Sequence, residues 1–97
     1  MIYMNDVLNV SFFSVDKQIA DIKCESVRLP VADSVKGNFS GFYGIKKGHA
    51  KASFSLKAGT VVLASEDKTI LSVEISDGFA TVEKNKVCII VDSLADA

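Results

Sequence analysis

Residues 51–91 read KASFSLKAGTVVLASEDKTILSVEISDGFATVEKNKVCIIV, and this stretch decides the fold class. Apolar and polar residues alternate over 52–56 and again over 79–83, which is typical of strands with one buried face. Turn-forming residues separate the apolar runs, and Asp77-Gly78 is a strong signal for a two-residue hairpin turn. Turn signals about every eight to ten residues predict an all-β fold, an antiparallel β-sandwich of about eight to ten short strands.

The N-terminal third continues this pattern. Alternation predicts a first strand over residues 6–14 and a second over residues 20–24, after which the apolar phase changes at Val27. A phase change within one strand predicts a bulge. Pro30 lacks a backbone donor and is expected to end pairing on that edge, so residues 31–40, with their Asp, Ser, Gly and Asn, are predicted to form a loop.

Residues 41–50 read GFYGIKKGHA and are predicted to form a shaped loop that presents a surface, because three glycines stand among two aromatic residues and a histidine. No acid, serine or second histidine stands beside His49, so neither a catalytic site nor a metal site is expected there. Lys46, Lys47 and Lys51 form a small basic cluster. A solvated face is the favoured interpretation of this cluster, and a binding patch is the alternative.

Length and composition bound the remaining possibilities. The chain has 97 residues, which predicts one domain over residues 1–97, and its net charge of −1 argues against a nucleic-acid or polybasic membrane partner. The apolar runs are short and the N-terminus lacks a signal-peptide pattern, so we expect a soluble intracellular protein. Cys24 and Cys88, each inside a predicted strand, are expected to be free buried thiols and not a disulfide, and the zinc signal is very weak. No cofactor or metal is expected.

Four segments, in this order, resemble the N-terminal β-sandwich of the epsilon subunit of F-type ATP synthases, called delta in mitochondria. The resemblance covers the chain from about Leu8 onward, and the glycine-rich segment is its most specific part. The segments are VRLP at 27–30, GFYGIKKGHA at 41–50, LKAGTV at 56–61, and the strand pair that runs from Val73 to Asp92.

The resemblance implies a noncatalytic rotor subunit of the central stalk, which supports coupled ATP synthesis by linking the gamma subunit to the ring of membrane c subunits. It implies a peripheral location on the cytoplasmic face of a bacterial inner membrane, or on the matrix face in mitochondria, without insertion into lipid. The isolated domain is expected to be a monomer. By position, the residues facing the c-ring are Gly41, Phe42, Tyr43 and Gly44, and those facing gamma are His49, Ala50, Ser53 and Phe54.

The chain departs from the family pattern in several respects, among them the loss of prolines, because Lys47, Lys51 and Ala58 stand where members usually have proline. Family members continue into a two-helix domain, whereas here a sandwich lacking the helical hairpin is expected, with residues 92–97 as the possible start of a helical region. The 31–40 connection is longer than usual, and Phe42 and Tyr43 replace an acidic residue often found between the first two glycines. The lost prolines and the divergent loop indicate relaxed constraints and favour a naturally short form.

Three alternatives remain open. Phe42 or Tyr43 is equally expected to fold back and plug the end of the sandwich. A satisfied structural role is favoured for His49 over a functional titrating group. A free-standing sandwich that binds a protein or carbohydrate ligand is the rival function, and a small enzyme is the least favoured.

Overall fold

The computed structural model describes residues 7–33 and 35–96, which form ten strands. In chain order these are β1 (Leu8–Phe13), β2 (Gln18–Cys24), β3 (Ser26–Ala32), β4 (Phe39–Lys46), β5 (Ala52–Leu56), β6 (Gly59–Ser65), β7 (Lys68–Ile75), β8 (Gly78–Glu83), β9 (Lys86–Val91) and β10 (Leu94–Asp96). Within the described residues, no helix is long and apolar enough to cross a membrane.

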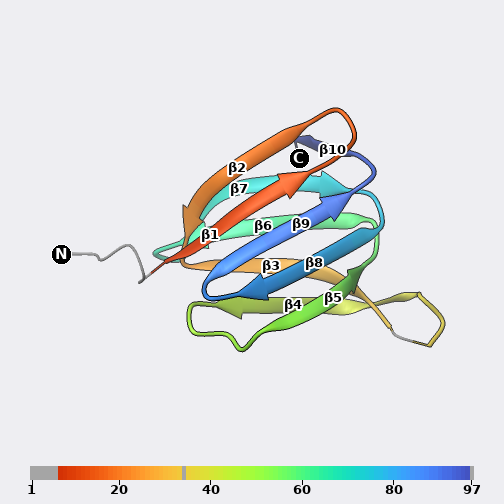
Figure 1. Ribbon diagram of the computed structural model, residues 1–97, viewed down its shortest axis with the longest axis horizontal. Coiled ribbons are helices and arrows are strands. Elements are labelled where there is room, and N and C mark those ends of the chain that lie inside the picture. Colours follow the sequence, from red (N-terminus) through yellow and green to blue (C-terminus); the bar gives the residue numbers. More distant parts are fainter. Residues whose placement is uncertain (1–6, 34, 97) are drawn as a thin grey trace.

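The strands form one hydrogen-bonded sheet that folds over itself into two layers (Figure 1). The front layer has the order β5-β8-β9-β1-β2, and the back layer has β10-β7-β6-β3, with β4 paired to the outer side of β3. The predicted all-β sandwich is thus confirmed. One pair departs from the antiparallel pattern, because β1 lies parallel to β9.

The core lies between the layers and is lined by alternate residues of each strand. In β8, for example, Ala80 and Val82 point inward while Phe79 and Thr81 point to solvent. Leu29 and Ile45 line the core from β3 and β4. Apart from the small Ser11 hydroxyl, the buried side chains among the described residues are apolar, so burial of apolar surface is the main stabilising contribution.

The bulge predicted at Val27 lies elsewhere. One strand ends at Cys24 and the next begins at Ser26, and this interruption at Glu25 by itself shifts the alternation of apolar residues. The actual bulge is in β2, where Ala20 and Asp21 together oppose Ser11 of β1, and Asp21 has a φ of 55°. The Ser11 hydroxyl accepts a hydrogen bond from the displaced Asp21 N–H at 3.1 Å.

Pro30 does not end its strand, because β3 continues to Ala32 and the following loop is shorter than predicted. On one side, β3 pairs with β6 as far as Arg28 and then with β5 at Val31. Pro30 lies where the strand exchanges one neighbour for the other, so its missing N–H removes no ladder bond on that side. Its carbonyl accepts the Lys57 N–H at 3.0 Å.

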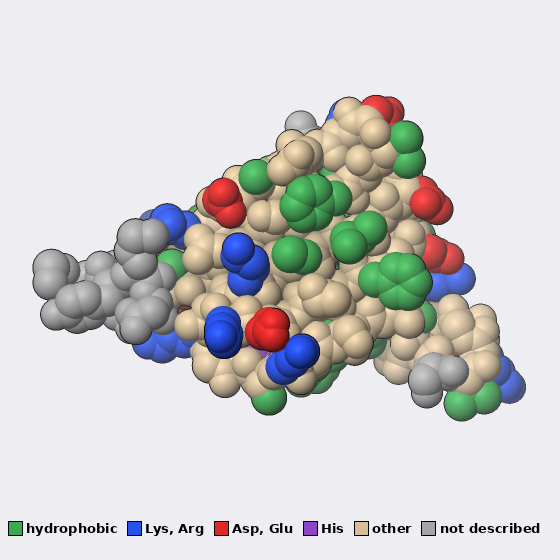
Figure 2. Space-filling model, in the orientation of Figure 1, with side chains coloured by type: hydrophobic (Ala, Val, Ile, Leu, Met, Phe, Trp, Pro, Cys, Tyr) green, Lys and Arg blue, Asp and Glu red, His purple; other side chains and the backbone are tan. Residues whose placement is uncertain are grey.

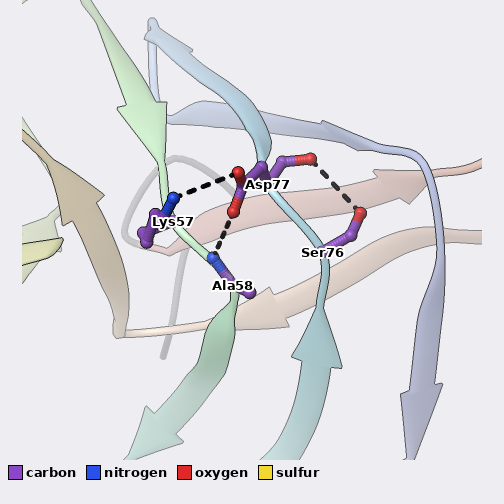
Figure 3. Close-up of polar contacts among 4 residues, drawn as sticks. All are labelled: Lys57, Ala58, Ser76 and Asp77. Carbon is purple, nitrogen blue, oxygen red and sulfur yellow. Dashed lines mark hydrogen bonds and ion pairs between the residues drawn. The ribbon is translucent and has the colours of Figure 1, made fainter. Parts of the chain in front are cut away.

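Asp77-Gly78 is not a hairpin turn, since β7 pairs with β6 and β10 while β8 pairs with β5 and β9. The pair is a corner at which the chain crosses between the layers. A second corner, at Lys57–Ala58, lies beside it (Figure 3). The Asp77 carboxylate joins the two corners by accepting the Ala58 N–H at 2.8 Å and contacting Lys57 Nζ at 3.4 Å.

Gly78 is required at its corner by space. A Cβ added there would lie 2.2 Å from the Ile90 carbonyl oxygen and 2.7 Å from a methyl carbon of Val91. Real hairpin turns occur at Glu66-Asp67 and at Lys84-Asn85, all with φ between 52° and 64° as two-residue type I′ turns require.

The C-terminal prediction is wrong in one respect. Leu94–Asp96 form β10, paired antiparallel to β7, and do not begin a helix. Leu94 is buried and extends the core, and its strand pairs with the edge of β7. Ala97 lies outside the described residues.

Candidate functional site

The glycine-rich segment is mostly strand and not loop. Residues 41–46 belong to β4, which pairs with β3 along its length, so the connection to β5 is confined to residues 47–51. Gly41 has a φ of 129° and lies where the register with β3 shifts, and Gly48 has a φ of 80° in the connection. Two of the glycines therefore meet backbone needs, as expected, whereas Gly44 has ordinary φ and open space around it.

Tyr43, His49 and Phe54 form one aromatic cluster where β4 and β5 approach each other. The ring centroids lie 4.9 Å apart for Tyr43 and Phe54, and 5.7 Å apart for Tyr43 and His49. Phe54 also packs against the core. The structure thus brings together one residue predicted to face the c-ring and two predicted to face gamma.

Both ring nitrogens of His49 have partners. Nδ1 lies 2.7 Å from the Ala50 carbonyl oxygen, which can only accept, so Nδ1 carries a proton. In the neutral ring Nε2 is then the acceptor, and the Tyr43 hydroxyl donates to it at 2.8 Å. This geometry agrees with the favoured interpretation of a satisfied structural histidine.

Phe42 points away from Tyr43, because adjacent residues of a strand alternate between faces. It lies on the outer face of the back layer and is 53% exposed, with the Arg28 guanidinium 5.1 Å from its ring centroid and Phe39 edge-on at 5.3 Å. We call Phe39, Phe42 and Arg28 the back-face aromatic patch. Of the two aromatics considered as plugs, Tyr43 turns inward and remains partly exposed, whereas Phe42 faces solvent.

Ser53 lies on the opposite outer surface, that of the front layer, where it is exposed. The neighbouring cross-strand row contains apolar side chains that the sequence analysis did not assign to a site, and green side chains gather across this face in Figure 2. Phe79 pairs with Ile90, and Ile90 with Phe13. We call Phe13, Phe79 and Ile90 the front apolar strip. Phe79 and Ile90 are 62% and 51% exposed, a signal that strand alternation alone could have given.

The predicted basic cluster is rearranged by the fold. Lys51 pairs with Glu83 at 3.4 Å on the solvent surface. Lys46 and Lys47 instead line a shallow groove together with Arg28 and His49, over Gly44. The surface ion pair contributes little stability, in keeping with a solvated face.

Neither cysteine forms a disulfide. Cys24 is buried as predicted, and burial raises the pKa of its thiol to about 11, so it stays protonated at neutral pH. Cys88 is only half-buried, on the front face. Within the part of the chain that the structure describes, no three His, Cys, Asp or Glu residues are placed to hold a metal ion.

Comparison with known proteins gives a family for this geometry. Residues 7–97 match the family model described as ATP synthase, Delta/Epsilon chain, beta-sandwich domain. The ATP synthase epsilon chain of Campylobacter jejuni subsp. jejuni serotype O:23/36 (strain 81-176) is 30% identical over 87 residues, which cover 90% of this chain and 62% of that protein. The epsilon chain of Nostoc punctiforme (strain ATCC 29133 / PCC 73102) is 34% identical over 86 residues, covering 88% and 58%.

Solved structures agree in fold. A chain of the Euglena gracilis mitochondrial ATP synthase, in a structure of OSCP, F1 and c-ring, superposes with a TM-score of 0.76 at 19% identity, covering 94% of this chain and 54% of that one. A chain from the central stalk and c-ring of the Tetrahymena thermophila mitochondrial enzyme gives 0.69 at 13% identity, covering 92% and 66%. This protein spans less than two thirds of the curated relatives named above. It belongs to the ATP synthase delta/epsilon chain family, of which it carries the β-sandwich domain.

Proposed function

We propose that the chain is the β-sandwich part of a noncatalytic central-stalk subunit of an F-type ATP synthase. In this role it links the gamma subunit to the ring of membrane c subunits and supports coupled ATP synthesis. It is peripheral, on the cytoplasmic face of a bacterial inner membrane or the matrix face of a mitochondrial one, and is held there by protein contacts. The family match over residues 7–97 is the observation that carries the proposal.

The two outer faces support separate partners. The front apolar strip places Phe79 and Ile90 on the same layer as Ser53, and exposed aromatic and branched side chains are the usual anchors of protein interfaces. We assign this face to gamma. The back-face aromatic patch lies beside Gly41 and Gly44, and we assign it to the c-ring.

Charge substitution tests the gamma assignment. The full chain is co-expressed with the gamma subunit of the same organism, and complex formation is followed by size-exclusion chromatography. Ser53→Arg is expected to abolish co-elution, because it places a charge in the proposed contact. Thr69→Arg, at an exposed position of β7 in the other layer, is the matched control and is expected to co-elute.

The c-ring assignment has its own pair of variants, tested for binding to detergent-solubilised c-ring. Phe42→Ser removes an exposed ring from the back-face aromatic patch and is expected to weaken binding at least about tenfold, as loss of an interface anchor does. Ile70→Ser, which removes an exposed apolar side chain from β7, is the control. If folded wild type binds neither gamma nor the c-ring, the rotor assignment fails and a free-standing module that binds a protein or carbohydrate takes its place.

A further inference from the structure

The edge where β4 and β5 approach each other is closed by side chains. In the described residues β4 pairs only with β3, and β5 pairs with β8 and at one position with β3, so no backbone ladder joins β4 to β5. The two strands belong to different layers (Figure 1). What holds them together at this edge is the covalent connection 47–51 and the aromatic cluster of Tyr43, His49 and Phe54.

One chain of hydrogen bonds ties β4 to the 47–51 connection. It starts at the Tyr43 hydroxyl, passes through both nitrogens of the His49 ring, and ends at the Ala50 carbonyl. The same connection is tied to the front layer by the Gly48 N–H, which donates to Asn85 Oδ1 at 2.7 Å in the β8–β9 turn. The connection is therefore bonded to both layers. Asn85 holds it to the front layer, while the Tyr43 hydroxyl and the Lys46 carbonyl, which accepts the His49 N–H at 3.2 Å, hold it to the back layer.

We propose that Tyr43 and His49 are positioning residues whose hydrogen bond fixes the gamma-facing and ring-facing surfaces relative to each other. This inference rests on the proposed function for its two partners. Tyr43 is adjacent to Phe42 of the back-face aromatic patch, and Phe54 is adjacent to Ser53 on the front face. A contact made on either surface is thereby transmitted across the edge to the other.

The backbone of Tyr43 is already held in place without its hydroxyl. It is paired with Leu29, which is fully buried, and its ring packs on Phe54 at 4.9 Å. Tyr43→Phe keeps that packing and removes only the donor, so the variant is expected to fold. The change isolates the link itself.

The first test measures the hydrogen bond between Tyr43 and His49 in the full chain, without a partner protein. His49 is the sole histidine, so its ring ¹⁵N resonances need no assignment. In wild type the neutral ring is expected to show a protonated Nδ1 and a hydrogen-bonded Nε2. Tyr43→Phe is expected to shift the Nε2 resonance toward that of an unbonded nitrogen and to accelerate amide exchange at Gly48 and His49, and Ser55→Ala, which removes an exposed hydroxyl of β5, is expected to change neither. An unchanged Nε2 resonance in Tyr43→Phe would show that Tyr43 and His49 are not hydrogen-bonded, whether or not any partner binds.

The second test measures whether the two surfaces are coupled, by determining affinity for purified gamma and for solubilised c-ring separately. Tyr43→Phe is expected to lower affinity for both, each by about threefold to tenfold, the scale of one lost hydrogen bond. Phe42→Ser is expected to lower affinity for the ring alone, and Ser53→Arg for gamma alone. If Tyr43→Phe affects one partner only, or neither, the coupling role is overturned. If wild type binds neither partner, the coupling role falls with the proposed function, while the Nε2 resonance still reports the link.

Discussion

The two ends of β5 are secured in opposite ways. At its C-terminal end the corner beside Asp77 is held by close backbone packing at Gly78, where no Cβ fits, and by a carboxylate that accepts the Ala58 N–H. At its N-terminal end no backbone ladder joins β5 to β4, so the edge is closed by the 47–51 connection and packed aromatic rings, and the aromatics on the neighbouring faces remain exposed. The corner therefore contributes to the fold itself, while the faces beside the edge leave aromatic side chains exposed.

The strongest test of this contrast is a matched pair of glycine substitutions. Gly78→Ala forces a methyl group into the Ile90 carbonyl, and overpacking against backbone is expected to cost roughly 3 kcal/mol of the free energy of unfolding. Gly44→Ala meets open space at ordinary φ and is expected to leave stability unchanged or raise it by up to about 1 kcal/mol. Urea denaturation measures both, and equal losses in the two variants would erase the contrast.

A smaller effect is expected when the carboxylate at the corner is removed. Asp77→Ala leaves the Ala58 N–H without its acceptor and separates the two corners, which is expected to cost about 1 kcal/mol at this exposed position. Asp77→Asn keeps an oxygen acceptor and is expected to recover most of that loss. Thermal unfolding of the three proteins decides the point, and an Ala variant as stable as wild type would show that the corner does not depend on the carboxylate.

On the face that we assign to the c-ring, substitutions should separate stability from binding. Phe42→Ser loses an exposed ring and its contact with Arg28, so its free energy of unfolding is expected to change by no more than about 1 kcal/mol. A loss of several kcal/mol in urea would mean that the back-face aromatic patch is part of the fold and would weaken its assignment to a partner.

The smallest effect on stability is expected in the β3–β4 loop, where the Asp33 carboxylate accepts hydrogen bonds from the loop backbone. The N–H groups of Lys36 and Val35 donate to its carboxylate at 2.7 and 2.8 Å and hold the pKa of Asp33 below its ordinary value. A lowered pKa means that this stabilisation is present above the ordinary value and is lost as pH falls through the folded one. The Lys36 and Val35 amide resonances should therefore titrate below the usual carboxyl range, and should not titrate in Asp33→Asn. If these amide resonances titrated at the ordinary carboxyl pKa, the hydrogen bonds to Asp33 would not be stabilising its ionised form.

Strand existence was predictable from sequence where one face is polar. Alternation located β5 and β8 closely, although β8 also places Phe79 outward. β9 was located in a different way, as a short run apolar on both faces that follows turn residues. β4 was missed because both of its faces carry aromatic residues and two of its positions are glycine, so no period of two is visible. The bulge at Asp21 likewise hid the common face of Ile19 and Ile22.

Neighbour relations were less accessible. A signal such as Asp77-Gly78 reports that the chain reverses, but not whether the next strand lies beside the last one or in the other layer. For the same reason the sequence did not predict the cluster of Tyr43, His49 and Phe54. The cluster forms because β4 and β5 approach each other without pairing, and local pattern does not report such an approach. The order of the family-like motifs carried the architecture that local pattern could not.

The parallel pairing of β1 with β9 also has a consequence for biosynthesis. Asn9 pairs with Lys86, so one side of the N-terminal hairpin has no partner until most of the chain exists. At a ribosomal rate of about 5–20 residues per second, roughly 3 to 13 s pass between completion of β2 and completion of β9, and during this time the edge of β1 lacks its partner. The front layer can therefore close only late in the synthesis of the sandwich, after β9 has been made.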